Sequence, residues 1–248
     1  MSERATEPSR VPDEERTPRR RILAAIGLLL VLSAATLGLL RSPLFGADRL
    51  VVEGTRRLSP ERVLEIAGIS RGQNVVWFDA DGARRRLESD PWIAEAAIRP
   101  DLPDTISVRI SERVAVGAVQ THEGWQVLAA DGVVLASRGG APNLPTITVA
   151  VPGEDVDTTG AGLLGAMDPD LRSRVRSLTI GADGLVRLAL HGGVAVVFGE
   201  PRDAEAKSRA LAAVLGWAAD EGARLQSIDI SLPAAPTALL AGGALARP

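Results

Sequence analysis

The segment that most constrains this chain is Ile22–Leu40, "ILAAIGLLLVLSAATLGLL", because its nineteen residues contain no charge and no continuous polar stripe. An α-helix rises about 1.5 Å per residue, so the segment reaches roughly 28 Å, close to the thickness of the hydrocarbon core of a bilayer. A cleaved signal peptide is the alternative, since Ser33-Ala34-Ala35 resembles a cleavage site. A signal core spans about 7–15 residues, however, and this run continues through Leu40. The sequence therefore predicts an uncleaved transmembrane helix over residues 22–40.

The charges beside this helix indicate its orientation. Arg19–Arg21 precede it and Arg41 follows it, which favours a cytoplasmic N-terminus and extracytoplasmic C-terminal domains. Three more arginines between residues 49 and 57 weaken the asymmetry, but long domains cross a membrane largely regardless of such charges. Residues 1–21 hold charge and proline and little that can form a core, so we expect a disordered cytoplasmic tail. The predicted location is the plasma membrane, with a single pass.

Composition excludes several kinds of chemistry. The chain of 248 residues has no cysteine, which rules out disulfides, thiolate catalysis and zinc–thiolate sites. Its formal net charge of −3 gives no reason to expect binding to nucleic acid. Aromatic residues make up 3% of the chain, so its cores must be built from Val, Leu, Ile and Ala.

The stretch after the anchor, residues 47–117, predicts a small domain of order β-α-α-β-β. Arg49–Gly54 is typical of a short strand, and Ser59–Gly68 of a helix that Ser59 caps and Gly68 ends. A second helix, capped by Asp79 or Asp81, precedes the strand "WIAEAAIRP". The expected architecture is a three-stranded sheet with both helices on one face.

The last strand of this domain shows which face is buried. From Ile106 the apolar residues alternate with polar ones, so Ile106, Val108 and Ile110 share a face against the helices while Arg109 faces water. Glu112 interrupts the apolar row, which Val114 and Val116 resume. We therefore expect one continuous strand to Val116.

Residues 118–233 predict a second, mixed α/β domain with a largely antiparallel sheet. "WQVLAADGVVLAS" is typical of a hairpin that turns at Asp131-Gly132. Further strands are expected in "NLPTIT", "VRSLTIG", "LVRLALHGG" and "VAVVFGE", and a helix over Ala204–Glu221. "LQSIDISLP" is expected to close the sheet as its final strand, and residues 234–248, rich in Ala, Pro and Gly, to form a flexible tail.

The same segments resemble a known family. "VEGTRRLSPERVLEIAGISRGQNVVWFD" and "DPWIAEAAIRPDLPDTISVRISERVAVG" resemble the POTRA domain of the FtsQ/DivIB family of bacterial cell-division proteins. The tail, the anchor and the second domain match the architecture of that family as well. The resemblance implies an α+β fold and a nonenzymatic membrane-anchored scaffold of the division machinery, located at the septum. Its signature in this chain consists of Gly54, Pro91, Trp92, Pro103, Glu112 and Arg113.

The resemblance also implies partners, namely division proteins of the FtsB/DivIC and FtsL type. In the family the C-terminal end of the second domain binds them, and a terminal strand often lies at a sheet edge, where a partner strand can pair with it. The candidate residues for this β-augmentation are Gln226, Ser227, Ile228, Asp229, Ile230, Ser231 and Leu232. The family often has an arginine where Ser231 stands, so no salt bridge is expected there. Arg49–Glu53 and Ile106–Glu112 are further contact candidates.

No catalytic, cofactor-binding or metal-binding constellation is evident. His122 and His191 are the two histidines, and neither lies in a zinc-site or nucleophile-elbow motif. Asp155, Asp157, Asp168 and Asp170 lack the spacing of a calcium loop, so a solvated loop is expected. We expect no cofactor and no small-molecule substrate, and we read the four tryptophans as core or sheet-edge residues.

Two other functions stay open. A POTRA module of a secretion or outer-membrane assembly system would be followed by a barrel of many alternating strands of about ten residues each, for which the remaining sequence is too short. A membrane-anchored cell-wall hydrolase would need a catalytic Cys/His, zinc or paired-glutamate site. Loss of function on mutating either histidine, with folding and partner binding intact, would favour the hydrolase.

Overall fold

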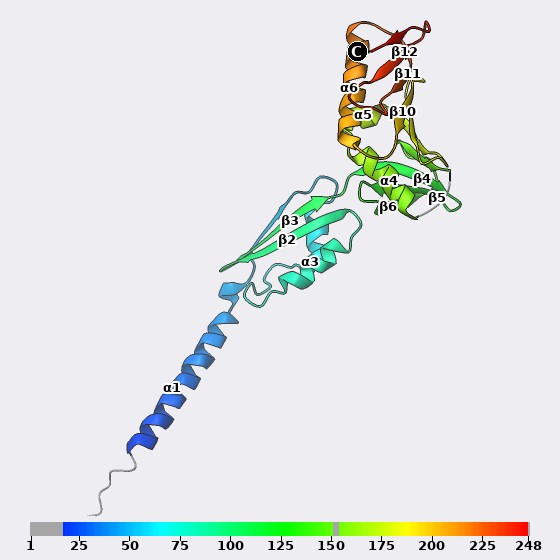
Figure 1. Cartoon of the computed structure of the whole chain (residues 1–248). Coiled ribbons are helices and arrows are strands. Elements are labelled where there is room, and N and C mark those ends of the chain that lie inside the picture. Colours follow the sequence, from blue (N-terminus) through cyan, green and yellow to red (C-terminus); the bar gives the residue numbers. More distant parts are fainter. Residues whose placement is uncertain (1–16, 151–153, 248) are drawn as a thin grey trace, which may run out of the picture. The chain divides into compact units, whose positions relative to one another are not determined.

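The structure, a computed structural model, describes residues 17–150 and 154–247 (Figure 1). Helix α1 (Thr17–Leu40) contains the predicted span, and Ile22–Leu40 is the part long and apolar enough to cross a membrane. The side chains of this part are exposed, as a bilayer-facing surface requires. The tail over residues 1–21 was expected to be disordered, but residues 17–21 belong to α1. The arginines there extend the helix beyond its apolar part. Residues 1–16 lie outside the described residues.

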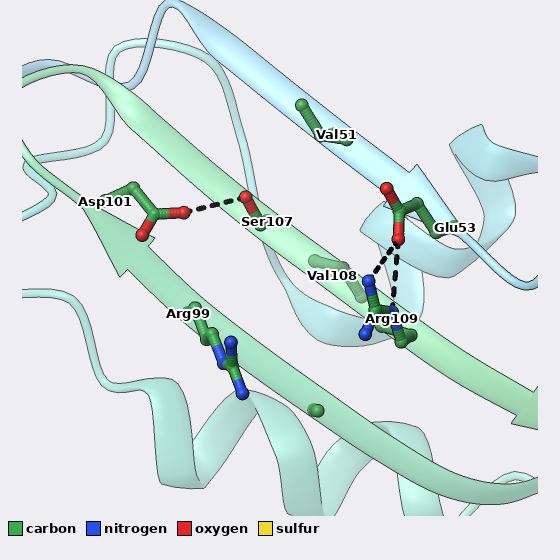
Figure 2. A pocket seen from close by; sticks show the side chains of 8 residues that line it. Val51, Glu53, Arg99, Asp101, Ser107, Val108 and Arg109 are labelled. Carbon is green, nitrogen blue, oxygen red and sulfur yellow. Dashed lines mark hydrogen bonds and ion pairs between the residues drawn. The ribbon is translucent and has the colours of Figure 1, made fainter.

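A three-stranded sheet follows α1 and the short 3-10 turn η1 (Pro43–Phe45). Its elements are β1 (Arg49–Glu53), α2 (Pro60–Ala67), α3 (Ala80–Glu88), β2 (Ile93–Asp101) and β3 (Thr105–Glu112). The predicted order β-α-α-β-β is confirmed. The strand order is β1-β3-β2, with β1 parallel to β3 and β2 running against it (Figure 2).

Capping residues fix the ends of the two helices. The Ser59 hydroxyl accepts a hydrogen bond of 3.2 Å from the Arg62 amide at the start of α2, and Gly68 ends that helix in the left-handed region at φ 68°. Asp79, and not Asp81, caps α3, because its carboxylate accepts from the Gly82 amide at 2.9 Å.

The buried face of this sheet is the predicted one. Ile106, Val108 and Ile110 are at most 4% exposed, whereas the Arg109 side chain is 73% exposed. The strand does not continue to Val116, however. β3 ends at Glu112, and a separate strand, β4, begins at Ala115 in another sheet, which leaves Val114 exposed.

The second sheet has ten strands in the order β13-β12-β11-β10-β9-β8-β7-β4-β5-β6. Most neighbouring pairs in it are antiparallel, as predicted, while β4–β7, β7–β8 and β10–β11 are parallel. The strands are β4 (Ala115–Thr121), β5 (Gly124–Ala129), β6 (Val134–Arg138), β7 (Thr146–Val149), β8 (Val175–Ile180), β9 (Val186–Leu190), β10 (Ala195–Gly199), β11 (Leu225–Asp229), β12 (Thr237–Leu240) and β13 (Leu245–Ala246).

Three helices accompany this sheet: α4 (Glu154–Gly165), α5 (Pro169–Arg174) and α6 (Ala204–Asp220). α6 runs along β10, β11 and β12 (Figure 1), and its Leu211 and Val214 join the main hydrophobic core with Phe198 of β10. The single lysine, Lys207, is also buried on α6, where it donates a hydrogen bond of 2.8 Å to the Glu200 carbonyl and lies over the Phe198 ring.

The C-terminal segment differs from the expected flexible tail. Residues 237–240 and 245–246 form β12 and β13, and Ala238 is buried in the core. The sequence does not predict these strands, because an Ala-, Pro- and Gly-rich stretch has no clear apolar alternation. Backbone hydrogen bonds to β11 order β12 whatever its side chains are.

The chain forms two compact units. One holds α1, the helices α2 and α3 up to Leu87, and Ala96–Arg109; the other holds Glu88–Glu95 and everything from Ile110 onward.

Candidate partner-binding surfaces

The predicted partner-binding segment, Gln226–Leu232, does not lie at a sheet edge. Strand β11 is flanked by β10 on one side and β12 on the other. Ile228 and Ile230 are 1% and 0% exposed, and the Ile230 amide donates to the Val197 carbonyl at 3.0 Å. The prediction that this strand is the terminal edge is therefore wrong, because the strands that follow it were not anticipated.

The two ends of the same segment remain accessible. Gln226, Ser231 and Leu232 are exposed, while Ser227 is half-buried. Asp229 accepts a hydrogen bond of 2.8 Å from the Ser231 amide, which turns the chain out of β11. A partner can touch these side chains, but it cannot pair with the β11 backbone while β12 is in place.

The edge of the ten-stranded sheet on this side is β13. Leu240 donates its amide hydrogen to the Ala244 carbonyl at 2.9 Å, so Leu239 and Leu245, the next pair along, form a pair without mutual backbone hydrogen bonds. The Leu245 N–H and C=O accordingly point away from β12, toward the open side. The Leu245 side chain is 76% exposed, so both the backbone and the side chain of this edge are available for pairing.

A second surface is the outer face of the three-stranded sheet (Figure 2). Arg109 donates to Glu53 at 2.8 Å from β3 to β1, and Ser107 donates to Asp101 at 2.8 Å. Arg99 lies on the same face beside them. The depression between these side chains holds about 220 Å³, less than the roughly 300–1,000 Å³ of small-molecule sites. This face suits contact with a protein surface better than capture of a small ligand.

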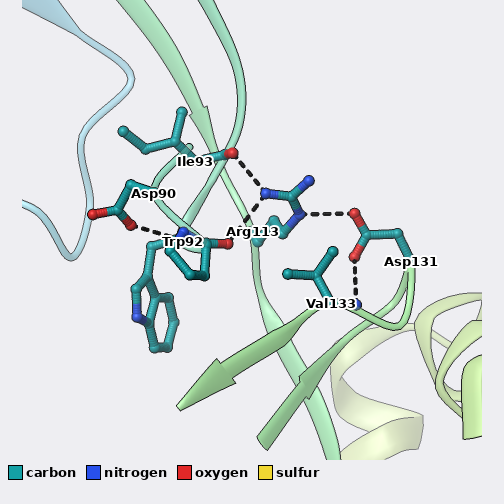
Figure 3. Close-up of polar contacts among 7 residues, drawn as sticks. Asp90, Trp92, Ile93, Arg113, Asp131 and Val133 are labelled. Atoms are coloured by element: carbon teal, nitrogen blue, oxygen red, sulfur yellow. Dashed lines mark hydrogen bonds and ion pairs between the residues drawn. The ribbon is translucent and has the colours of Figure 1, made fainter. Parts of the chain in front are cut away.

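Arg113 organises the start of the second unit (Figure 3). Its guanidinium donates to the Ile93 carbonyl at 2.6 Å, to the Pro91 carbonyl at 3.1 Å and to the Asp131 carboxylate at 2.7 Å. The Arg113 amide donates to the Trp92 carbonyl at 2.8 Å. One arginine thus clamps the chain after α3 to the turn between β5 and β6.

The environment of Asp131 changes its acidity. Burial works to raise the pKa of this carboxyl, but the hydrogen bond from Arg113, the one from the Val133 amide and the nearby positive charge outweigh it. The net effect is a pKa below the ordinary value of 3.8. The Asp131 carboxyl is therefore ionised throughout the physiological pH range.

The other signature residues have structural positions. Gly54 ends β1 with φ 87°, a conformation that favours glycine, and Pro103 lies in the turn between β2 and β3. Trp92 packs on the apolar cluster of β5 and β6, as expected of a core residue. Glu112 is the last residue of β3 and is half-buried. Trp77 does not follow this pattern, because 57% of it is exposed.

Within the described residues, no group of three or more His, Asp or Glu side chains is arranged to hold a metal ion. The His122 side chain is 90% exposed and its Nε2 lies 3.6 Å from the Glu123 carboxylate, and His191 is exposed directly after β9. Asp168 and Asp170 lie at the start of α5, whereas the side chains of Asp155 and Asp157 lie outside the described residues.

Comparison with known proteins identifies the family. The sequence profile described as "POTRA domain, FtsQ-type" matches residues 45–113, and "Cell division protein FtsQ/DivIB, C-terminal" matches residues 117–231. The chain belongs to the FtsQ/DivIB family. The resemblance inferred from the sequence is confirmed, and with it the assignment to bacterial cell division.

Similar proteins include cell division protein FtsQ of Mycobacteroides abscessus, 30% identical over 214 residues that cover 85% of this chain and 67% of the relative. FtsQ of Mycobacterium tuberculosis H37Rv is 28% identical over 218 residues, covering 87% of this chain and 68% of the relative. Among solved structures, the major extracytoplasmic domain of DivIB from Geobacillus stearothermophilus is similar to this chain. The match covers 43% of this chain and 96% of that domain. It is 18% identical with a TM-score of 0.34, which is too low to compare the folds.

Proposed function

We propose that this FtsQ/DivIB family member is a nonenzymatic scaffold of the division machinery, anchored in the plasma membrane by α1. Its N-terminus lies in the cytoplasm, and both folded domains lie outside the membrane at the septum. The observation that carries the proposal is the open β13 edge of the ten-stranded sheet, which continues from the residues that the FtsQ/DivIB profile matches, 117–231. A surface with free backbone donors and acceptors binds protein strands.

The partners are division proteins of the FtsB/DivIC and FtsL type, and the contact is a strand added to the sheet at β13. This moves the binding strand from Gln226–Leu232 to the β12–β13 hairpin, two strands closer to the edge. Short edge strands limit unwanted pairing, and β13 spans only two residues, so a partner strand must also gain side-chain contacts, for which the exposed Leu245 side chain is available.

Leu245→Pro tests the backbone pairing. The proline removes an N–H that points to the open edge, so the bonds between β12 and β13 stay intact. We expect co-purification of FtsB/DivIC- and FtsL-type partners with the full chain, from detergent-solubilised membranes, to be lost in this variant. Leu245→Ala is the matched control, because it keeps the N–H and removes most of the same side chain.

Retention of the partners by Leu245→Pro would contradict strand addition at β13. Loss in both variants would show that the Leu245 side chain, and not the backbone, makes the contact. Circular dichroism and thermal unfolding of the purified variants distinguish either result from misfolding.

A further inference from the structure

A second contact with the membrane follows from the segment that joins α1 to the three-stranded sheet. The peptide between the end of α1 and β1 forms η1, and its backbone pairs with the loop before α3. The Val75 amide donates to the Phe45 carbonyl at 2.8 Å, and the Ala47 amide donates to the Gln73 carbonyl at 2.8 Å. The loop of residues 70–78 is therefore held beside the outer end of the membrane helix.

One side chain ties that loop to the helix itself. The Asn74 amide nitrogen donates to the Leu40 carbonyl, one of the last carbonyls of α1, at 2.8 Å. The oxygen of the same amide accepts from the Val76 amide at 3.0 Å and from the Trp77 amide at 3.3 Å. A single amide group thus spans from the end of α1 to Trp77, so the Trp77 backbone lies within about 10 Å of the Leu40 carbonyl.

The residues brought together here are apolar and exposed. Trp77 is 57% exposed and Leu44, in η1, is 69% exposed. Arg41 and Arg71 lie exposed on the same two segments. We call these four residues the collar. A large exposed Trp and Leu are costly in water, while the interface of a bilayer favours an aromatic ring with an N–H together with arginine side chains at the headgroups.

The dimensions of the bilayer place the collar at that interface. Ile22–Leu40 spans about 28 Å, which fills the hydrocarbon core and leaves Leu40 at its boundary. The headgroup region adds roughly 5–8 Å on each side, and the start of η1 and the Trp77 backbone, within about 10 Å of the Leu40 carbonyl, follow directly on the end of the span. The collar therefore contacts the lipid leaflet that holds the C-terminal end of α1, because its residues follow directly on the membrane span.

We propose that the collar binds the lipid headgroup region, with Trp77 and Leu44 inserted at the level of the glycerol groups and Arg41 and Arg71 at the phosphates. Asn74 is the positioning residue that holds the loop in place. This contact makes the three-stranded domain a membrane-surface domain with a restricted orientation. The inference depends on membrane insertion of α1 and not on partner binding at β13, so each can fail without the other.

The test measures the depth of Trp77 in the full chain, reconstituted in vesicles of phosphatidylethanolamine and phosphatidylglycerol. Parallel samples contain lipid with a quencher on the headgroup, at a shallow acyl position or at a deep acyl position. The fluorescence of Trp77 is obtained by subtracting the spectrum of the Trp77→Phe variant from that of the native protein, because the three other tryptophans contribute to both spectra. We expect this difference signal to be blue-shifted and quenched most by the headgroup and shallow quenchers.

Trp125→Phe provides the matched control, because Trp125 is a half-buried residue of β5 in the other compact unit. Its difference signal should be unaffected by lipid quenchers. An unquenched Trp77 signal would overturn the proposal, and so would equal quenching of the Trp125 signal, which would show unselective lipid contact.

Asn74→Leu tests the positioning role. We expect loss of Trp77 quenching and faster amide hydrogen exchange in residues 70–78, with exchange in the ten-stranded sheet unchanged. Quenching as strong as in the native protein would overturn the role of Asn74.

Discussion

Replacing Arg113 by alanine should lower the free energy of unfolding of the second unit by about 2–4 kcal/mol. The Arg113 side chain is only 18% exposed and donates to two carbonyls and one carboxylate. The part-buried bond to the Ile93 carbonyl accounts for about 1.5–3 kcal/mol of this, since its donor is charged. Asp131 is 49% exposed, so solvent screening limits the ion pair to about 1 kcal/mol.

Arg109→Ala is the matched control. Arg109 also donates to a carboxylate, Glu53, at 2.8 Å, but its side chain is 73% exposed on the outer face of the sheet. We expect a loss of no more than about 1 kcal/mol. Urea unfolding of the full chain in mild detergent, followed by tryptophan fluorescence, measures both variants. Hydrogen exchange in residues 88–95 reports the local effect. Equal losses in the two variants would refute the reasoning that burial and the carbonyl acceptors decide the magnitude.

The ion pair adds a pH dependence with a defined sign. Because the pKa of Asp131 is lowered in the folded state, its contribution is fully present above the unfolded value of 3.8 and is lost as the pH falls through the folded value. Asp131→Asn should consequently be less stable than the native chain at neutral pH, and this difference should disappear in acid. A difference that persists below the folded pKa of Asp131 would contradict an ionic contribution.

Three further predictions use other parts of the second unit. Gly117→Ala should destabilise the chain by about 1–3 kcal/mol, because the new Cβ would lie 2.8 Å from a packed side-chain carbon. Gly216→Ala in α6 should stabilise it by about 0.5–1 kcal/mol, because a Cβ there meets nothing within 4 Å. Urea unfolding compares the two variants. The hydrogen bond from Arg187 lowers the pKa of Asp183 to about 2, so an NMR titration should show this value rising toward 3.8 in Arg187→Gln. An amine-reactive ester should leave buried Lys207 unmodified in the native chain and acylate it only after unfolding, as mass spectrometry can show; rapid native labelling would contradict its burial.

Local patterns were sufficient to predict the three-stranded domain. Ser59, Gly68 and Asp79 delimit helices through hydrogen bonds to residues within four positions, and such bonds can be anticipated from the sequence. The alternation around Arg109 likewise identifies the buried face, because a strand places successive side chains on opposite sides.

The candidate site could be predicted only in part. The sequence placed it near the C-terminal end of the second domain, but selected β11, where Ile228 and Ile230 alternate in a typical strand pattern. β12 and β13 carry no such pattern. Their order comes from pairing with β11, for example between Ala238 and Ile228, and such non-local backbone bonds leave no local signal.

The sequence by itself determined the apolar helix long enough to cross a membrane, the β-α-α-β-β order and the family, since each depends on apolar composition, apolar periodicity, capping residues or motifs that are contiguous in the chain. Only the tertiary structure decided which strand lies at the edge, that Arg113 clamps residues 91–93 to the β5–β6 turn, and that Asn74 holds exposed Trp77 beside the end of α1. The Arg113 contacts join residues that are 18 and 20 positions apart, and the Asn74 contact joins residues 34 positions apart. They exist only once packing has brought such residues together, and no local preference of the chain encodes that proximity.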